Sequence, residues 1–395
     1  MPNRPTLHVK PREGRRARAG APWIFSNEIV MDAKAKALAP GSLVNVQADE
    51  HRLFGVGYFN PKTLIAVRLF EAPAETAIDK PFLAARLERA LRIRKAFFEK
   101  PYYRLVHAEG DGLPGLIVDR FGSTLVVQIA TAGMEALLEP LLEALDDVVS
   151  PDAMVLRADA AARALEGLDS YVRFARGEEV ARVRLEENGS QYFADVESGQ
   201  KTGWYFDQRD NRAFMANLAM NKSVLDAYCY TGGFAIQAAR SGAKEAIGLD
   251  SSQPALFLAE EAATANGVAK ACKFVKTDVM EELERLAQKS EKFDIVVADP
   301  PPFVRTKKDL EAGARAYRKL ARLAANVTRP GGFVLLASCS HNISMERFAE
   351  ECGTGLHRAG RRAALIRQST AGMDHPVHPL LPETAYLKAL VFAMD

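Results

Sequence analysis

Carboxylates and one thiol mark the ends of successive apolar runs in this sequence. Asp226, Asp250, Asp278 and Asp299 each close or follow such a run, and Cys339 follows a later one within Ser-Cys-Ser. Carboxylates accept hydrogen bonds and attract positive charge, so several of them together suit a polar ligand with a cationic group. A cysteine thiolate is a nucleophile that can form a transient covalent bond. These residue types predict a ligand-binding site that includes a nucleophile.

The apolar runs alternate with segments of helical spacing, which is typical of a parallel sheet with helices on both faces. We predict strands at residues 223–227, 245–250, 273–276, 293–298, 332–338, 363–367 and 387–393. We predict helices between them at residues 234–240, 254–265, 280–288, 312–326 and 345–351. Ligands bind such sheets at the carboxyl ends of the strands, where the acids and Cys339 stand. The expected fold class is therefore α/β, with a seven-stranded Rossmann-like domain at the C-terminus.

The first of these strands leads into a turn with two glycines, Gly232 and Gly233, and then into an alanine-rich helix. Glycines let the backbone approach a ligand where a Cβ would collide. A nicotinamide dinucleotide would need G-x-G-x-x-G to seat its pyrophosphate, but the third glycine is absent and Asp226 would repel phosphates. An acid at the second strand end can instead accept the hydroxyls of a ribose, and one at the third strand end can accept an adenine amino group. We therefore favour S-adenosylmethionine as the ligand.

Two further domains are expected before this one. Short alternating segments with turn signals between residues 7 and 70 predict a small β-barrel, and mixed helical and strand patterns follow it. The predicted domains are residues 1–73 for the β-domain, 74–186 for an α+β middle domain and 187–395 for the Rossmann-like domain. His107, Glu109 and Asp111 resemble a site, but a Gly-Asp-Gly turn explains them without a catalytic role.

Bulk properties limit the partners and the compartment. The chain has 395 residues, of which 48% are hydrophobic and 26% charged, with a net charge of +2. A nucleic-acid partner would thus need local basic patches. Residues 1–20 are rich in arginine and lysine, and both a solvated arm and a phosphate-contacting surface remain open. The sequence has no secretion signal, no membrane-length apolar run and no C-x-x-C pair, so we expect a cytoplasmic protein without a metal site or membrane contact.

Three motifs in order, VLDAYCYTGGFA, DPPPF and SCS, resemble the class I methyltransferases that modify RNA. With the N-terminal β-domain, the stretch KTGWYFDQRDNR and the later Asp374-His375-Pro376, the chain is similar over nearly its whole length to the large-subunit (23S) ribosomal RNA cytosine-C5 methyltransferase I family. The resemblance implies that the β-domain is an RNA-binding PUA domain and that the partner is large-subunit ribosomal RNA. A homodimer remains open.

The resemblance also implies roles for individual residues. Cys339 would add to C6 of cytosine and so activate C5, whereas the alternative is an ordinary small residue at a strand end. Asp299 would bind the ring edge of the flipped base and is one candidate, with His341 and His375, for removing the C5 proton. The expected cofactor-binding residues are Asp226, Tyr228, Thr231, Gly232, Gly233, Asp250, Ser251, Asp278, Val279 and Asp299. The expected substrate-binding residues are Pro300, Pro301, Phe303 and Lys307.

Other interpretations stay open from the sequence alone. Helix N-capping is an alternative role for Asp250 and Asp278. The enzyme could methylate a guanine or an adenine of ribosomal RNA, although a cysteine after the fifth strand favours cytosine. The chain could also be a non-catalytic RNA-binding assembly factor with a vestigial cofactor site.

Overall fold

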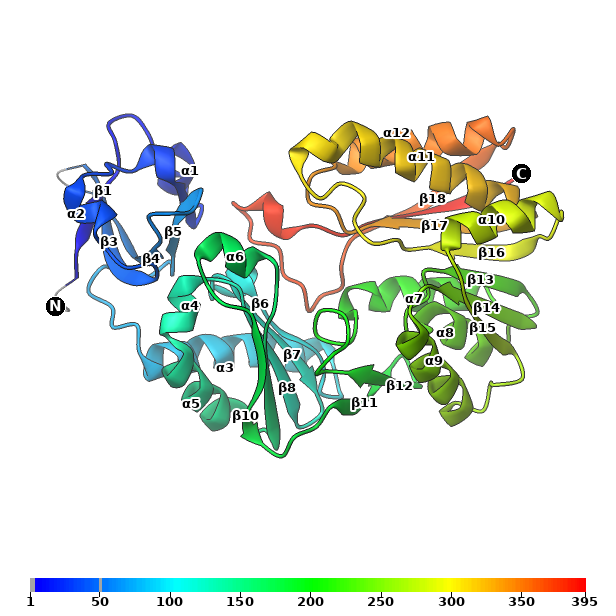
Figure 1. Cartoon of the computed structure of the whole chain (residues 1–395), viewed down its shortest axis with the longest axis horizontal. Coiled ribbons are helices and arrows are strands. Elements are labelled where there is room, and N and C mark those ends of the chain that lie inside the picture. The colour runs from blue at the N-terminus through cyan, green and yellow to red at the C-terminus, as the bar shows by residue number, and fades with distance from the viewer. Residues whose placement is uncertain (1–3, 50–51) are drawn as a thin grey trace. The chain divides into compact units, whose positions relative to one another are not determined.

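The computed structural model describes residues 4–49 and 52–395, and Figure 1 shows the course of the chain. The chain divides into two compact units. The N-terminal unit comprises Met1–Val183, Asp195–Trp204 and Met373–Thr384, and the C-terminal unit comprises Arg184–Ala194, Tyr205–Gly372 and Ala385–Asp395. None of the helices within the described ranges combines the length and the hydropathy that crossing a bilayer requires.

The N-terminal unit begins with a five-stranded sheet in the order β1-β3-β4-β5-β2. Its elements are β1 (Thr6–His8), α1 (Arg15–Arg18), β2 (Trp23–Phe25), the 3-10 turn η1 (Ser26–Glu28), α2 (Ala33–Lys36), β3 (Ser42–Asp49), β4 (Arg52–Phe59) and β5 (Ile65–Leu69). Residues of the strands, among them Val44, Val46 and Phe59, form its buried core. Side chains on alternate positions of a strand face the same side, which is the pattern in the sequence. The predicted strand-rich segment is confirmed.

A second five-stranded sheet follows in the order β10-β9-β8-β7-β6. Its elements are α3 (Lys80–Phe97), β6 (Tyr102–His107), η2 (Ala108–Asp111), β7 (Leu116–Phe121), β8 (Thr124–Ile129), α4 (Ala132–Ala136), α5 (Leu138–Val149), β9 (Ala153–Ala158), α6 (Ala162–Glu166) and β10 (Tyr171–Gly177). Helix α3 begins at the N-cap Asp79, whose carboxylate accepts a hydrogen bond from the Phe82 N–H. Its buried face includes Leu83, Leu87 and Leu91, at helical spacing.

The two sheets of the N-terminal unit share a hydrophobic core. Val56, Tyr58 and Phe70 belong to the same buried cluster as Leu83 and Leu105. The boundary predicted between residues 73 and 74 therefore lies inside one compact unit, and the division into three domains stays a prediction.

Buried ion pairs fix the turn that contains Glu109 and Asp111. The guanidinium of Arg94 is fully buried and donates to both oxygens of Asp111, at 2.6 and 2.8 Å, and to the carbonyl of Asp374 at 2.9 Å. Glu109 accepts a hydrogen bond from Arg68 at 2.6 Å. Breaking such a pair leaves an uncompensated buried charge, which is strongly destabilising. These contacts support the structural interpretation of the two acids.

The C-terminal unit contains a seven-stranded sheet in the order β15-β14-β13-β16-β17-β19-β18. The strands are β13 (Ser223–Ala227), β14 (Glu245–Asp250), β15 (Cys272–Lys276), β16 (Phe293–Ala298), β17 (Thr328–Ser338), β18 (Ala363–Ser369) and β19 (Lys388–Met394). The first five are parallel, and β19 is antiparallel to both β17 and β18. The predicted α/β fold with seven strands is confirmed.

Helices cover both faces of this sheet (Figure 1). They are α7 (Arg209–Asn217), α8 (Gly233–Arg240), α9 (Gln253–Ala265), α10 (Val279–Gln288), α11 (Leu310–Asn326) and α12 (Met345–Arg358). Leu225 and Val296 pack with α10, α11 and α12, whereas Val224 and Val297 pack with α7 and α8. Strands buried on both faces read as continuous apolar runs, which is why the sequence locates them well. The remaining elements are β11 (Arg182–Glu187), β12 (Ser190–Asp195), η3 (Phe206–Gln208), η4 (Lys307–Asp309) and η5 (Pro382–Thr384).

Candidate active site

The turn between β13 and α8 has a constrained backbone. Tyr228 and Tyr230 adopt left-handed φ values of 66° and 50°, and Gly232 has a φ of 78°. Residues other than glycine rarely occupy this region, and those that do cluster at functional sites. A Cβ on Gly232 would come within 3.0 Å of the Ala259 side chain, among others. The glycine turn predicted from the sequence is therefore a tightly held loop at the carboxyl edge of the sheet.

Two carboxylates hold this loop in place. Asp226 is fully buried and accepts a hydrogen bond from the Ala235 N–H at 3.0 Å. Asp250 accepts hydrogen bonds from the N–H groups of Tyr230 at 2.9 Å and Ser252 at 2.8 Å. The first N–H groups of a helix have no partner within the helix, so Asp226 satisfies one that α8 leaves open.

Asp226 has a perturbed protonation equilibrium. Burial raises the pKa of Asp226 to about 7; the charges of Asp299 and Asp250 also raise it, while the hydrogen bond from Ala235 opposes the shift. Asp226 Oδ1 and Thr231 Oγ1 are buried without a hydrogen-bond partner among the described residues. Buried polar atoms of this kind are uncommon in folded proteins and suit a polar ligand. Because the charges of Asp299 and Asp250 act on Asp226, these three strand-end acids are within electrostatic reach of one another.

Asp278 lies beyond β15 as the N-cap of α10. Its carboxylate accepts a hydrogen bond from the Glu281 N–H at 3.0 Å, so the N-capping interpretation applies to this acid. Burial raises the pKa of Tyr228, and the charges of Asp278 and Asp250 raise it further. Tyr228 is therefore within electrostatic reach of both acids. Of the other predicted cofactor-binding residues, Ser251 is exposed and Val279 is buried as the first residue of α10.

Asp299 and Cys339 follow the neighbouring strands β16 and β17. Burial raises the pKa of Tyr205, and negative charge on Tyr230, Asp207, Asp299 and Cys339 raises it as well. The charges of Asp299 and Cys339, the two residues predicted to be catalytic, therefore both act on Tyr205. Cys339 is half-buried.

The other cysteines are poorly suited to nucleophilic chemistry. Burial raises the pKa of Cys272 to about 12 and raises the pKa values of Cys229 and Cys352 well above the ordinary thiol value. A thiol with a raised pKa carries little thiolate near neutral pH.

A network of hydroxyl groups ties the loop containing Cys339 to the loop after β16. Ser338 Oγ donates to Tyr317 Oη at 2.8 Å, and Tyr317 Oη and Ser340 Oγ share a hydrogen bond at 3.0 Å. The N–H groups of Phe303 and Val304 donate to Tyr317 Oη at 3.4 Å and to Ser340 Oγ at 3.3 Å. Both serines of the Ser-Cys-Ser motif are buried and serve this network. The residues on either side of Cys339 are therefore both held by hydrogen bonds.

The predicted substrate-binding residues divide between buried and exposed positions. The Phe303 ring packs on Tyr317, with a centroid separation of 4.8 Å, and Pro300 is buried. Pro301 and Lys307 are exposed. Further along α11, Arg318 and Lys319 are paired with the acids Glu351 and Glu284, at 2.6 and 2.9 Å.

The two histidines considered as proton acceptors lie in different units. His341 belongs to the C-terminal unit, and its ring centroid is 5.4 Å from that of Tyr386. His375 belongs to the N-terminal unit, where its Nδ1 lies 2.8 Å from Asp374 Oδ1 and its ring lies 5.0 Å from that of His107. His375 is buried in this cluster.

Sequence reasoning missed several residues beside Cys339. Tyr205, Asp207, Tyr317 and Tyr386 were assigned no role, yet the Tyr386 hydroxyl donates to the Asp207 carboxylate at 2.5 Å and the charge of Cys339 acts on Tyr205. The stretch Tyr205-Phe206-Asp207-Gln208 stands directly before α7, and its aromatic and polar residues were the available signal. Tyr317 and Tyr386 offered none, because each reaches the site through the packing of its own element.

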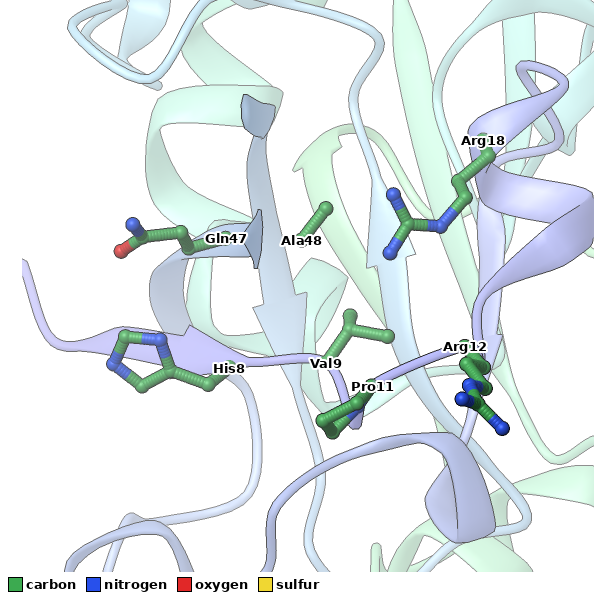
Figure 2. Close-up of a pocket in the computed structure, with 7 residues that line it drawn as sticks. All are labelled: His8, Val9, Pro11, Arg12, Arg18, Gln47 and Ala48. Carbon is green, nitrogen blue, oxygen red and sulfur yellow. The ribbon is translucent and has the colours of Figure 1, made fainter. Parts of the chain in front are cut away.

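A separate basic pocket lies on the N-terminal unit (Figure 2). It has a volume of about 500 Å³ and is lined by His8, Val9, Pro11, Arg12, Arg18, Gln47 and Ala48. Arg18 is held by the Glu13 carbonyl at 3.2 Å and by the Phe54 ring, whose centroid is 5.9 Å from its guanidinium carbon. Part of the arginine-rich N-terminal segment thus lines a concave surface.

We expect Asp226→Asn to stabilise the protein at about pH 8 but not at about pH 4. The protonated carboxyl of Asp226 stabilises the fold fully below its usual pKa of about 4, and this contribution is lost as the pH rises through about 7. The amide carries no charge and avoids that loss. Chemical denaturation of both proteins without ligand, across this range, measures the difference. Asp294→Asn is the control: burial raises its pKa, but hydrogen bonds from Ser223 lower it overall, so no gain is expected at pH 8. A pH-independent difference for Asp226→Asn would contradict the assignment.

Tyr317→Phe should lower the free energy of unfolding by about 1–3 kcal/mol, because the buried Ser338 and Ser340 hydroxyls lose a partner. A double-mutant cycle with Ser338→Ala separates this effect from packing. The cost of Tyr317→Phe should be smaller when Ser338 is already alanine. Strictly additive costs would show that the hydroxyl network does not act as a unit.

Comparisons with known proteins agree with this architecture. The family of PUA-like domains matches residues 7–72, and the family of S-adenosylmethionine-dependent methyltransferases matches residues 113–393. Solved structures with the same fold include a protein described as a SAM-dependent methyltransferase from Streptococcus mutans, with a TM-score of 0.83 and 19% identity over 98% of this chain and 100% of that one. Another is described as a methyltransferase complexed with SAH, with a TM-score of 0.85 and 19% identity over the same shares of both chains.

Curated relatives match at higher identity. The ribosomal RNA large subunit methyltransferase I of Shewanella amazonensis is 36% identical over 390 residues, which cover 98% of each chain. The protein of the same name from Aeromonas salmonicida is 36% identical over 375 residues, which cover 94% of each chain. This chain therefore belongs to the ribosomal RNA large subunit methyltransferase I family, and its cofactor is S-adenosylmethionine.

Proposed function

We propose that this protein methylates C5 of a cytosine in large-subunit ribosomal RNA, using Cys339 as a transient covalent nucleophile. The observation that carries the proposal is that Asp299 and Cys339 follow the neighbouring parallel strands β16 and β17, and that the charges of both act on Tyr205. A thiol and a carboxylate at one edge of the sheet would provide a nucleophile for C6 and a hydrogen-bond acceptor for the base. The names of the curated relatives support ribosomal RNA as the substrate.

The residues around the glycine turn fit the cofactor. Each oxygen of Asp250 accepts one backbone hydrogen bond and keeps a second lone pair, so Asp250 can still accept ribose hydroxyls. Asp278 would accept the adenine amino group, and Asp226 would add negative potential near the cationic end. We assign Tyr228, Thr231, Gly232, Gly233, Ser251, Val279 and Asp299 to the same site. When bound, S-adenosylmethionine supplies an electrophilic methyl group on a sulfonium sulfur.

Cys339 would make C5 of cytosine reactive. Its thiolate forms a bond to C6, and the electron pair of the C5–C6 double bond moves to C5, which becomes a nucleophile. After C5 has been methylated, a base removes the C5 proton. The electron pair of that C–H bond restores the double bond, the S–C6 bond breaks, and the thiolate is regenerated.

Asp299 would orient the base, and the carbonyl of Pro300 would accept a hydrogen bond from its exocyclic amino group. Asp299 and His341, which belong to the same unit as Cys339, and His375 are the candidates for the proton acceptor. A stacked base cannot reach a strand-end pocket, so the cytosine would have to leave its stack.

Phosphate contacts would come from exposed basic residues. The pocket in Figure 2 brings Arg12, Arg18 and His8 together on the PUA-like domain, and Lys307 is exposed after the DPPPF loop. Positive side chains on a concave surface attract a phosphate backbone. Action on ribosomal RNA would place the protein in the cytoplasm. A homodimer is the alternative to a single chain.

Cys339→Ala should reduce methyl transfer by at least about a thousandfold, because the activating covalent bond cannot form. Calorimetry should find S-adenosylmethionine binding nearly unchanged. Cys272→Ala, which alters a half-buried thiol on the edge strand β15, is the matched control and should retain activity. Base-resolved mass spectrometry of the product should find 5-methylcytosine. Full turnover by Cys339→Ala, or methylation of a purine, would refute the proposal.

Reversing the charge of Arg12 and Arg18 together should weaken RNA binding about tenfold or more at low salt and flatten its salt dependence. Binding of S-adenosylmethionine should not change. Arg362→Glu, at a side chain that is 94% exposed, serves as a control for the loss of positive charge. An equal loss of affinity in both proteins would argue against a specific role for the pocket.

A further inference from the structure

Lys388 occupies an unusual position for a lysine. It is the first residue of β19, and its side chain is buried, with only 7% of the residue exposed. In the antiparallel pairing of β19 with β17, Lys388 lies directly opposite Ser338, the residue before Cys339. Lysine is almost never buried without a partner, so its surroundings call for an explanation.

The ammonium group of Lys388 is fixed by backbone oxygens. Its Nζ donates to the carbonyl of Ser340 at 2.9 Å and to the carbonyl of Tyr386 at 2.9 Å. Neither oxygen carries a full charge, and no carboxylate lies within ion-pair distance of Lys388 in the part of the chain that the structure describes. Burial lowers the pKa of Lys388, and the one opposing influence is the negative charge of Cys339. The negative charge that acts on this ammonium is the one that Cys339 carries when its thiol ionises.

We propose that Lys388 is a positioning residue for Cys339, which anchors the Ser340 carbonyl and places a positive charge beside the sulfur that favours its thiolate form. This inference rests on the proposed function, in which Cys339 is the nucleophile. When the thiol ionises, its proton leaves to solvent, which the half-buried side chain can reach. Lys388 keeps its own protons throughout and touches neither the base nor the cofactor.

The phenols and acids whose charges act together with that of Cys339 do not supply a positive charge. Tyr205 precedes α7 and Tyr317 lies on α11; burial raises the pKa of each phenol, and charge on Cys339 raises it further. Both are therefore neutral near pH 8. Asp207 and Asp299, which share the surroundings of Tyr205, are acids and would disfavour a thiolate.

The test follows the ionisation of Cys339 in the full-length protein without cofactor. The rate of alkylation by iodoacetamide is measured against pH, and peptide mass spectrometry assigns the product to Cys339. Lys388→Met removes the charge but retains the length of the side chain, and we expect the midpoint of the rate profile to rise by about one pH unit. Lys388→Arg retains the charge and should keep the midpoint within a few tenths of a unit of the wild type. Lys276→Met, at an exposed lysine on β15, is the control and should leave it unchanged.

An unchanged midpoint in folded Lys388→Met would overturn the proposal. Lys388→Gln provides a second neutral variant if the methionine variant does not fold, and it carries the same expectation. The pH profile of kcat should move to higher pH with the alkylation midpoint, while KM for S-adenosylmethionine stays constant; a uniform loss of kcat at every pH would indicate a purely structural role. Alkylation reports on the thiol whether or not it is the nucleophile, so activity in Cys339→Ala would refute the proposed function separately.

Discussion

The burial of one carboxylate, Asp226, close to other acids at the carboxyl edge of the sheet is the constraint on which the site depends. Parallel strands bring Asp226, Asp250 and Asp299 within electrostatic reach, and burial together with repulsion among them raises the pKa of Asp226 to about 7. Backbone N–H groups of Ala235, Tyr230 and Ser252 offset part of the cost, and two residues must hold left-handed conformations to present the loop. In the proposed site, a cationic ligand would relieve this repulsion, so that the lower stability of the free protein would favour binding of a sulfonium compound.

The half of the site around Cys339 is held by different groups. Hydroxyls of Tyr317, Ser338 and Ser340 connect it to the loop after β16, and the ammonium of Lys388 fixes the Ser340 carbonyl. None of these groups is anionic near neutral pH. This difference matters in the proposed mechanism, where the thiol of Cys339 must ionise and the turn after β13 must attract a positive charge. The two halves share one sheet edge but have opposite electrostatic requirements.

The sequence predicted the sheet better than it predicted the site. Strands β13, β14 and β16 begin and end at the predicted residues because they are buried on both faces and flanked by turns. Helix α12 extends to Arg358, beyond the predicted end at residue 351, and Gly355 lies within the helix. A Cβ there would lie 2.4 Å from the Arg318 carbonyl, so this glycine allows close packing against α11. Strand β10 was missed because its residues are largely exposed at a sheet edge.

The motif residues were predictable because each follows a strand in the order of the chain. The residues that hold them in place, such as Lys388 and Tyr317, were not predictable. Lys388 lies beside Cys339 only because β19 enters the sheet antiparallel, between β17 and β18, so that its first residue pairs with the last residue of β17. Tyr317 reaches both loops because one turn of α11 passes beneath them, and no spacing in the sequence records that contact. In the proposed mechanism, β19 therefore supports the nucleophile as well as linking β17 to the edge strand β18. A Ser-Cys-Ser motif on a sheet that lacked this antiparallel insertion would present the same thiol without the ammonium, and its thiolate would be less favoured at the same pH.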